Sequence, residues 1–313
     1  ITAKDKSNII TNLLSSYLEN NPKKEIIHFF INNYVIDGVN EVKDPETLFA
    51  NSLKVRVFIV TAKCSYLMNL ANYIGRHHID IEKFIAAPIA FSSCYLSEEN
   101  KEKNSLYIDI GALQTEFILF EKGEVFYMDY VPIGADFITS DIAKCLSIDF
   151  NSAERLKTIH GTADPGIYDK NRFIDLKANS IISSNKAMDN ISYEILGKII
   201  KSRVEEIFEI INNKIIDLTY TDSSYNIDSV TLTGGGSLLF GIKDVARIVL
   251  NQKIDSSFNN KIIINDGLTS PIYDTLVGMI LFIGQKHKLR YVNSNNNSIA
   301  GLKKLVNWIV KNF

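Results

Sequence analysis

The residues best placed for chemistry are a carboxylate and a tight turn at the end of an apolar strand. Asp109 lies at the end of the apolar segment 105–110, Gly111 follows it, and Thr115 opens the next strand at 115–120. An acidic side chain at such a strand end can orient metal-bound water, while backbone N–H groups of the turn face a phosphate. The same Asp-Ile-Gly triplet can also be a simple turn, so it defines a site only together with other elements.

A second candidate is the glycine loop formed by Gly234, Gly235, Gly236 and Ser237. It separates an apolar strand at 229–233 from an apolar segment that predicts a helix. Three glycines allow close approach to the backbone, and a helix N-terminus presents unpaired N–H groups to a phosphate or sugar. The loop lacks both the lysine of a Walker sequence and the spacing of a dinucleotide fingerprint. A structural turn is therefore the alternative.

A third candidate is the pair Glu154 and Lys157, which come after Ser152 and lie three residues apart on one predicted helix. This spacing puts both side chains on one helix face, where their charged groups can reach a common ligand such as a ribose or a purine edge. The alternative is a solvated ion pair within the helix.

The last fifteen residues, 299–313, combine an apolar stripe with a cationic face. At about 100° per residue the stripe covers roughly 140°, with three lysines opposite and no acidic side chain. The asparagine- and serine-rich stretch at 291–298 predicts a flexible linker. The pattern predicts an interfacial helix, each lysine contributing on the order of 1 kcal/mol near anionic lipid; the alternative is a helix docked on its own protein. The residues expected to meet the membrane are Leu302, Lys303, Lys304, Leu305, Val306, Trp308, Ile309, Val310, Lys311 and Phe313.

The composition argues against several functions. The 313 residues carry 34 basic and 36 acidic side chains, a net charge of −2, so we expect no nucleic-acid partner. The three cysteines, Cys64, Cys94 and Cys145, lack ligand spacing and predict reduced thiols without a metal centre. We find no signal peptide and no apolar stretch of about 18 residues that could span a bilayer. The chain begins at Ile1 instead of Met, so we expect an N-terminal piece to be missing.

Hydrophobic periodicity predicts the elements that position these candidates. Residues 7–20 predict a helix capped by Ser7, followed by strands that give the opening segment an α+β character. Three strands with tight turns between 105 and 133 predict a β-meander. A 3.6-residue period over 191–219 predicts one long amphipathic helix. We also expect a strand at 261–266 and helices at 65–77, 90–96, 139–146, 151–159, 238–250 and 269–284.

The order of these pieces resembles the FtsA family of bacterial cell-division proteins, which are actin-like members of the superfamily of actin, sugar kinases and heat-shock ATPases. The resemblance runs almost end to end. It is carried by HFFINNYVIDG and the following VKDP, Ala87-Pro88-Ile89-Ala90, the DIG at 109, VPIGADFITSDIA, AERLKTIHG, IIKSRVEEI, TLTGGGSLLFGI, PIYDTLVG and GLKKLVNWIVKNF.

The resemblance implies a fold class and a domain plan. We expect an α/β, two-lobed actin-like (ribonuclease H-like) fold with an additional small α+β subdomain, truncated at the N-terminus. The expected parts are the small subdomain remnant at 1–62, the first lobe at 63–103 and 271–288, the second lobe core at 104–138 and 226–270, its peripheral subdomain at 139–225, a linker at 289–298 and the membrane helix at 299–313.

The resemblance also implies a nucleotide site for ATP with Mg²⁺. Asp109, Gly111 and Thr115 match the second phosphate hairpin of the family, Glu154 and Lys157 its adenosine contacts, and the glycine loop with Ser237 its adenosine loop. Leu113 and Gln114 stand where the family has a glycine- and threonine-rich turn, and residues 1–100 contain no first phosphate hairpin. We therefore expect a weakened ATP site and no enzymatic activity.

The resemblance further implies partners and a location. The family tethers FtsZ filaments to the cytoplasmic face of the inner membrane at the division site, and it self-associates into filaments. We expect the FtsZ C-terminal tail to bind near Lys201 and Arg203, anionic lipid to bind the last helix, and other division proteins to bind elsewhere. The alternatives are a nucleotide-free actin-like scaffold, a pilus-assembly actin homologue and a small-molecule kinase of the superfamily.

Overall fold

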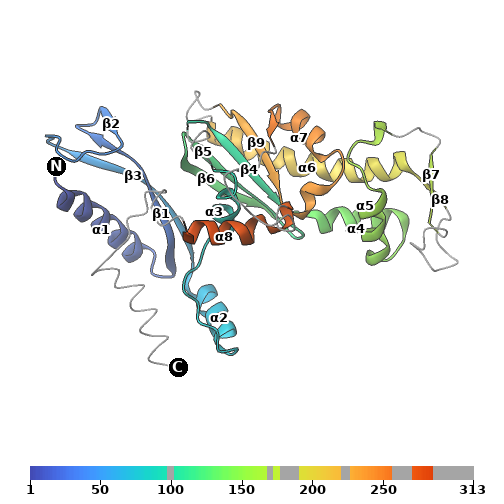
Figure 1. The fold of residues 1–313 in the computed structure, drawn as a ribbon, viewed down its shortest axis with the longest axis horizontal. Coiled ribbons are helices and arrows are strands. Elements are labelled where there is room, and N and C mark those ends of the chain that lie inside the picture. Colours follow the sequence, from blue (N-terminus) through green and yellow to red (C-terminus); the bar gives the residue numbers. More distant parts are fainter. Residues whose placement is uncertain (97–101, 168–171, 177–189, 220–225, 256–269, 285–313) are drawn as a thin grey trace. The chain divides into compact units, whose positions relative to one another are not determined.

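The computed structural model describes residues 1–96, 102–167, 172–176, 190–219, 226–255 and 270–284 (Figure 1). The chain divides into two compact units at residue 86, with residues 87–282 forming the larger one. The domain boundaries expected at 62 and 103 stay predictions. The expected strand at 261–266, the linker and the membrane helix at 299–313 lie outside the described residues.

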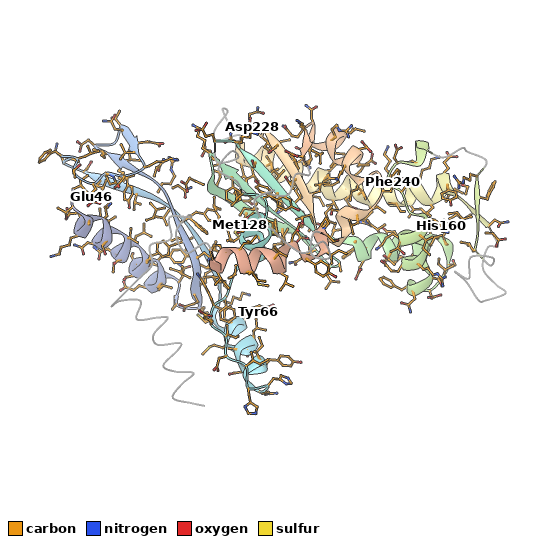
Figure 2. The ribbon with its side chains drawn as sticks, in the orientation of Figure 1. Glu46, Tyr66, Met128, His160, Asp228 and Phe240 are labelled. Atoms are coloured by element: carbon orange, nitrogen blue, oxygen red, sulfur yellow. The ribbon has the colours of Figure 1, made fainter. Side chains whose placement is uncertain are left out.

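The smaller unit is a helix packed on a three-stranded antiparallel sheet. The sheet has the order β2-β1-β3, and Asp37 and Gly38 turn the chain between β1 and β2 with positive φ angles of 49° and 78°. Ile10 of the helix packs against a cluster that includes Phe29 and Tyr34. A second helix follows the sheet and carries Tyr66, which is 69% exposed (Figure 2). The elements are α1 (Ala3–Asn20), β1 (Lys24–Ile36), β2 (Asn40–Val42), β3 (Leu53–Lys63) and α2 (Cys64–Gly75).

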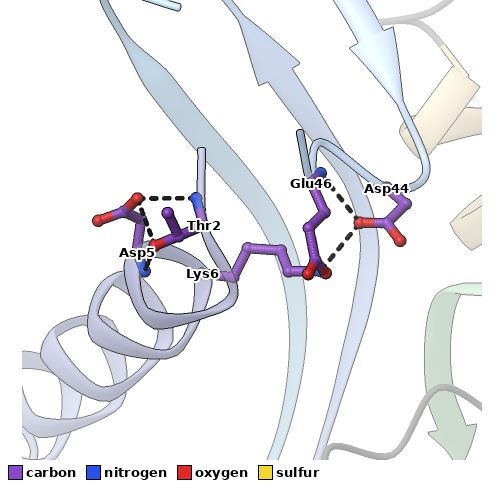
Figure 3. Close-up of polar contacts among 5 residues, drawn as sticks. All are labelled: Thr2, Asp5, Lys6, Asp44 and Glu46. Atoms are coloured by element: carbon purple, nitrogen blue, oxygen red, sulfur yellow. Dashed lines mark hydrogen bonds and ion pairs between the residues drawn. The ribbon is translucent and has the colours of Figure 1, made fainter. Parts of the chain in front are cut away.

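Helix α1 begins four residues earlier than the predicted start at residue 7, and its cap is Thr2, so the assignment of Ser7 as the cap was wrong. The Asp5 N–H donates to Thr2 Oγ1 at 3.3 Å, and the Thr2 N–H donates to Asp5 Oδ2 at 2.8 Å (Figure 3). This reciprocal capping box satisfies two backbone donors of the first turn. Lys6 then pairs with Asp44 at 2.9 Å and Glu46 at 2.7 Å, which ties α1 to the segment after β2.

The larger unit is built on a five-stranded mixed sheet with the order β10-β9-β4-β5-β6. The predicted meander forms its antiparallel part, and β9 pairs with β4 in parallel. The strands are β4 (Ser105–Ile110), β5 (Thr115–Glu121), β6 (Glu124–Val131), β9 (Ser229–Thr233) and β10 (Ile254–Asp255); a separate pair is β7 (Phe173–Asp175) and β8 (Asn190–Ser192).

Helices pack on both faces of this sheet. Leu106 and Ile108 of β4 belong to a core shared with helices α4 to α7, whereas Tyr107, on the opposite face, stacks on Tyr95 at a centroid distance of 5.8 Å. Successive side chains of β4 therefore pack into two different apolar layers, because both faces of the sheet are covered. The helices are α3 (Ala87–Ser92), α4 (Ala135–Leu146), α5 (Phe150–His160), α6 (Tyr193–Thr219), α7 (Ile242–Leu250) and α8 (Asp274–Gly284), with 3₁₀ turns at Pro165–Ile167, Gly235–Leu238 and Pro271–Tyr273.

Several helix starts differ from the sequence prediction. Helix α3 begins at Ala87, three residues before the expected start, and α8 begins at Asp274, five residues after it. Helix α4 begins at Ala135, four residues before the expected start, because Gly134 supplies an extended N-cap with no polar side chain to mark it. The helix expected directly after the glycine loop begins only at Ile242, since the loop first forms its 3₁₀ turn and Gly241 then adopts φ 79°. The glycine loop is therefore not the N-terminus of an α-helix.

Candidate functional site

The parallel pairing of β4 and β9 brings two of the predicted motifs together. Asp109 lies opposite Thr233 in the register, so the acidic strand end and the glycine loop meet at the carboxyl end of the sheet. Gly234 has φ 80°, and a Cβ placed on it would stand 2.0 Å from Asp109 Oδ1. A Cβ on Gly236 would stand 2.4 Å from Ile110 Cγ2. These two glycines are needed because the loop packs directly against the end of β4.

The middle glycine of the loop differs from its neighbours. No described atom lies within 4 Å of a Cβ placed on Gly235. Ser237, in contrast, is buried, and its hydroxyl donates to the Gly234 carbonyl at 2.7 Å, which closes the turn. Gly235 is therefore the loop position that leaves its backbone open to a ligand, whereas the Ser237 hydroxyl is used within the protein.

The carboxylate of Asp109 is enclosed by polar and acidic neighbours. Thr275 Oγ1 donates to Asp109 Oδ2 at 3.2 Å. Burial raises the pKa of Asp109, the Thr275 hydrogen bond opposes that rise, and nearby Asp274 adds to it. Glu116 lies directly opposite Asp109 on β5, and its pKa is also raised, first by burial and then by Asp109. Within the described ranges no basic side chain hydrogen-bonds or ion-pairs with Asp109.

The hairpin turn after β4 is held by its own backbone and by the start of α4. The Gly111 N–H donates to the Gln114 carbonyl at 3.0 Å. The carbonyls of Gly111 and Ala112 accept from the N–H groups of Ala135 and Asp136, both at 2.9 Å. The first N–H groups of α4 are thus already bonded to the turn, and Leu113, at its tip, is 71% exposed.

Thr115, expected in the phosphate hairpin, lies in the interior. Its side chain is fully buried, and its hydroxyl donates to the Ile133 carbonyl at 2.8 Å. The residue fastens β5 to the segment between β6 and α4. Its hydroxyl is therefore used within the protein.

Glu154 and Lys157 form an ion pair at 2.6 Å, but it is not the solvated pair considered from the sequence. Lys157 is 8% exposed, and its ammonium also donates to the Ala135 carbonyl at 3.2 Å and to Thr139 Oγ1 at 2.8 Å. Thr139 in turn donates to Glu154. Burial raises the pKa of Glu154, but hydrogen bonds from Lys157 and Thr139 outweigh it and hold the pKa below its usual value. The pair joins α5 to the first turn of α4.

Backbone contacts connect these pieces further. Ala135 accepts from Lys157 and donates to the Gly111 carbonyl, so it links α5 with the β4–β5 turn. The loop after α5 meets the segment after the glycine loop, because the Ala163 N–H donates to the carbonyl of Phe240, labelled in Figure 2, at 2.8 Å. The predicted motifs therefore belong to one connected region, although several of their polar groups bond to each other.

Sequence reasoning missed Asp274, which is 1% exposed in the first turn of α8. Its carboxylate accepts hydrogen bonds from the hydroxyls of Tyr95 and Thr233, and burial raises its pKa against those bonds. Among the described residues no hydrogen-bond donor reaches Asp274 Oδ1. An acidic residue opening the apolar segment PIYDTLVGMILFIG was the available signal, but first-turn acidic residues are common in helices.

The two cations expected to meet a partner already have acidic neighbours. Lys201 Nζ lies 3.6 Å from Glu205, and both side chains are 38% exposed. Arg203 Nε lies 2.6 Å from Asp141 on α4, and its guanidinium also pairs with Glu206. The hydrogen bond with Asp141 raises the pKa of Arg203.

Metal-ligand clusters and membrane-spanning helices were sought in the described residues. The described part of the chain contains no cluster of three histidine, cysteine or acidic side chains able to hold a metal ion, and no helix in it is long and apolar enough to cross a membrane.

A cavity of about 150 Å³ lies at the start of β4, where it is lined by Leu106, Asn212, Ile227 and Gln252 among others. It has no ionisable lining residue, and Asp109 at the opposite end of β4 is not among its lining residues.

Family models match both units. The model described as "Cell division protein FtsA" matches residues 106–278, more than half of the chain, and the model described as "SHS2 domain inserted in FTSA" matches residues 1–61. The chain belongs to the FtsA family. The resemblance inferred from the motifs is thereby confirmed, and membership assigns the chain to cell division.

Individual FtsA relatives are distant in sequence. The cell division protein FtsA of Borreliella burgdorferi is 28% identical over 301 residues, which are 92% of this chain and 70% of that protein. The FtsA of Rhizobium meliloti is 28% identical over 231 residues, 74% of this chain and 52% of that protein. The chain thus spans from about half to 70% of the length of these FtsA relatives.

Solved structures confirm the predicted actin-like α/β fold of the FtsA family. The PilM–PilN type IV pilus biogenesis complex matches with a TM-score of 0.60 at 14% identity, covering 92% of this chain and 74% of that chain. MreB5 of Spiroplasma citri bound to ADP matches with a TM-score of 0.53 at 15% identity, covering 79% of this chain and 68% of that chain. At these identities the likeness shows the fold alone.

Proposed function

We propose that this chain is a division adaptor that tethers FtsZ filaments, the Z ring, to the cytoplasmic face of the bacterial inner membrane. The observation that carries the proposal is the match of FtsA family models to 106–278 and 1–61, in a chain whose last fifteen residues are cationic and amphipathic. Self-association into filaments and contact with other division proteins belong to the same proposal.

Membrane attachment rests on the sequence of the last helix. Its apolar stripe would enter the headgroup boundary while its lysines meet anionic lipid. These residues lie outside the described part of the chain, so the argument is one of composition and periodicity. The adaptor would therefore be a peripheral membrane protein at the division site.

We propose the carboxyl ends of β4 and β9 as the place where ATP binds together with Mg²⁺. Gly235 offers open backbone to a phosphate or sugar. Asp109 is a partly buried carboxylate without a basic partner in the described structure, so a cation that enters with the nucleotide would supply the missing positive charge. When bound, Mg²⁺ would supply positive charge against the phosphates. The residues present thus fit the group, with Asp109 holding cation-bound water.

The proposed site is weak, and we expect binding without turnover. The hydroxyls of Thr115 and Ser237 already donate to main-chain carbonyls, and Glu154 and Lys157 already bond to each other. Leu113 occupies the tip of the phosphate hairpin. A nucleotide would have to displace some of these contacts, which lowers the net free energy of binding.

The FtsZ C-terminal tail is proposed to bind on α6 at Lys201 and Arg203. A tail carboxylate can replace Glu205 beside Lys201, because an exposed pair of this kind contributes only about 0–1 kcal/mol. Arg203 has five N–H donors, so it can donate to a further carboxylate while it stays bonded to Asp141. Arg203 is thus pre-oriented, whereas Lys201 exchanges partners.

Co-sedimentation with anionic liposomes tests membrane attachment. The wild type is compared with a chain lacking 299–313, with Val306→Glu on the apolar stripe, and with Asn307→Glu on the polar face as a matched control. We expect the truncation to abolish sedimentation because it removes the helix, and Val306→Glu to abolish it because it puts a charge into lipid. Asn307→Glu should retain most of it, because its charge stays on the polar face. A folded wild type that stays in the supernatant would contradict the proposal.

A further inference from the structure

The first turn of α8 contacts both strand ends that form the candidate site. Thr275 Oγ1 donates to Asp109 Oδ2 at 3.2 Å, and the neighbouring Asp274 accepts from Thr233, the last residue of β9. Two adjacent residues of one helical turn thus reach two neighbouring strands. The sequence separation of 166 residues between Thr275 and Asp109 hides this arrangement from any local pattern.

Asp109 depends on few groups for its orientation. Its Oδ1 lies beside Gly234, where even a Cβ would stand only 2.0 Å away, and its Oδ2 takes the Thr275 hydroxyl. In the described structure the Thr275 hydroxyl donates a hydrogen bond to this carboxylate, and no basic side chain bonds to it. Removing the Thr275 hydroxyl would leave the carboxylate held from the glycine side only.

Thr275 is itself held in place by its neighbours. Asp274 is 1% exposed and accepts from both Tyr95 and Thr233. One turn further, Gly278 packs so closely on α3 that a Cβ would stand 1.8 Å from the Ala90 carbonyl oxygen. These contacts hold the start of α8 against α3 and β9, so the Thr275 hydroxyl is presented at a fixed position.

We propose that Thr275 is a positioning residue for Asp109, with Asp274 anchoring the turn that presents it. The hydrogen bond from Thr275 holds the Asp109 carboxylate in the orientation that meets the cation accompanying a bound nucleotide. Thr275 itself touches neither nucleotide nor cation. The inference rests on the proposed ATP site. It adds a residue on α8 that affects binding at the phosphate end of the nucleotide alone, where the cation lies.

The test is a titration of the full chain with a fluorescent ATP analogue, with Mg²⁺ and again in EDTA. Thr275→Val removes the hydroxyl and keeps the shape, Thr275→Ser restores the donor, and Thr11→Val on α1 of the other unit is the matched control. We expect Thr275→Val to weaken binding about tenfold with Mg²⁺ and less than about twofold in EDTA. The hydrogen bond is lost in both buffers, but the orientation of Asp109 affects binding only when the cation is present. Thr275→Ser and Thr11→Val should bind like the wild type.

A double-mutant cycle separates positioning from a general structural role. In an Asp109→Asn background, Thr275→Val should have no further effect on Mg²⁺-dependent binding. Equal losses with and without Mg²⁺, or additive losses in the double mutant, would overturn the inference. So would a Thr275→Val chain that binds like the wild type, while leaving the ATP site intact. A folded wild type that binds no nucleotide would overturn the ATP site and this inference together, and the liposome experiment would still test the adaptor.

Discussion

Gly234 and Asp109 lie in contact at the carboxyl end of the sheet, where a Cβ on the glycine would stand 2.0 Å from the carboxylate oxygen. The contact explains why a glycine with φ 80° follows β9, since no side chain fits between the loop and the strand. It also makes the glycine loop part of the environment of Asp109, so loop geometry and carboxylate orientation cannot change independently.

Gly234→Ala should therefore destabilise the chain strongly. The left-handed backbone alone costs about 1–2 kcal/mol for an L-residue, and the overlap with Asp109 adds to it. Gly235→Ala, one residue along, has open space at the Cβ and should change the free energy of unfolding by less than about 1 kcal/mol. Urea unfolding of both variants measures the difference; equal effects would show that the loop does not pack on β4 as described.

Asp274→Asn should stabilise the chain relative to the wild type more at neutral pH than at acidic pH. The folded pKa of Asp274 is raised by burial, so its contribution is fully present below the unfolded pKa and is lost as pH rises through the folded pKa. Asparagine keeps an acceptor for Tyr95 and Thr233 without the charge. Each unit of raised pKa corresponds to about 1.4 kcal/mol of relief at pH 7.

Unfolding curves of wild type and Asp274→Asn at pH 4 and pH 7 give this difference. Asp274→Ala serves as the comparison, because it removes the acceptor as well as the charge and should be less stable than Asp274→Asn at both pH values. A pH-independent difference between wild type and Asp274→Asn would mean that Asp274 is not shifted in the folded state.

Lys157→Met should destabilise the chain by about 1–3 kcal/mol, because it leaves Glu154 and Thr139 without their shared cationic donor. Lys198→Met removes a pair with Glu194 in which the lysine is 65% exposed, and it should cost less than about 0.5 kcal/mol. The pKa of Glu154 is lowered, so its stabilising contribution is present at neutral pH and lost as pH falls through the folded pKa. Thermal unfolding of both variants at neutral pH is decisive; similar melting temperatures would contradict a buried network.

Thr2→Ala should cost about 1 kcal/mol in the smaller unit, because it removes the acceptor that caps α1. Ser7→Ala is the control, since Ser7 lies inside the helix and should change stability by a few tenths of a kcal/mol. Amide hydrogen exchange of the first turn of α1 reports the cap directly. Faster exchange in Ser7→Ala than in Thr2→Ala would refute the cap assignment.

Much of the fold follows from local patterns. The short apolar runs at 105–110 and 115–120, separated by a tight turn, identify the strands, and the 3.6-residue period of 191–219 identifies the long helix. The α1 cap was also readable: Thr2 and Asp5 have the spacing of a capping box. Ser7 also has a capping side chain and lies two residues before Ile9, where the apolar run begins.

The orientation of the site side chains could not be read in the same way. Whether the Thr115 hydroxyl faces a ligand depends on the Ile133 carbonyl, eighteen residues away, and whether Lys157 is free depends on α4. Thr275 meets Asp109 only because α8 returns to the carboxyl end of β4. Motif spacing identifies which residues gather at a site, whereas tertiary contacts decide which of their polar groups remain available.

The adaptor role is tested most directly by asking whether the chain links an FtsZ tail peptide to a membrane. A labelled peptide is sedimented with anionic liposomes in the presence of the wild type, the chain lacking 299–313, or Lys201→Glu with Arg203→Glu. The account predicts that peptide reaches the pellet only with the wild type, and that the double variant still binds liposomes by itself. Peptide that stays in the supernatant while the folded wild type coats the liposomes would contradict the central claim.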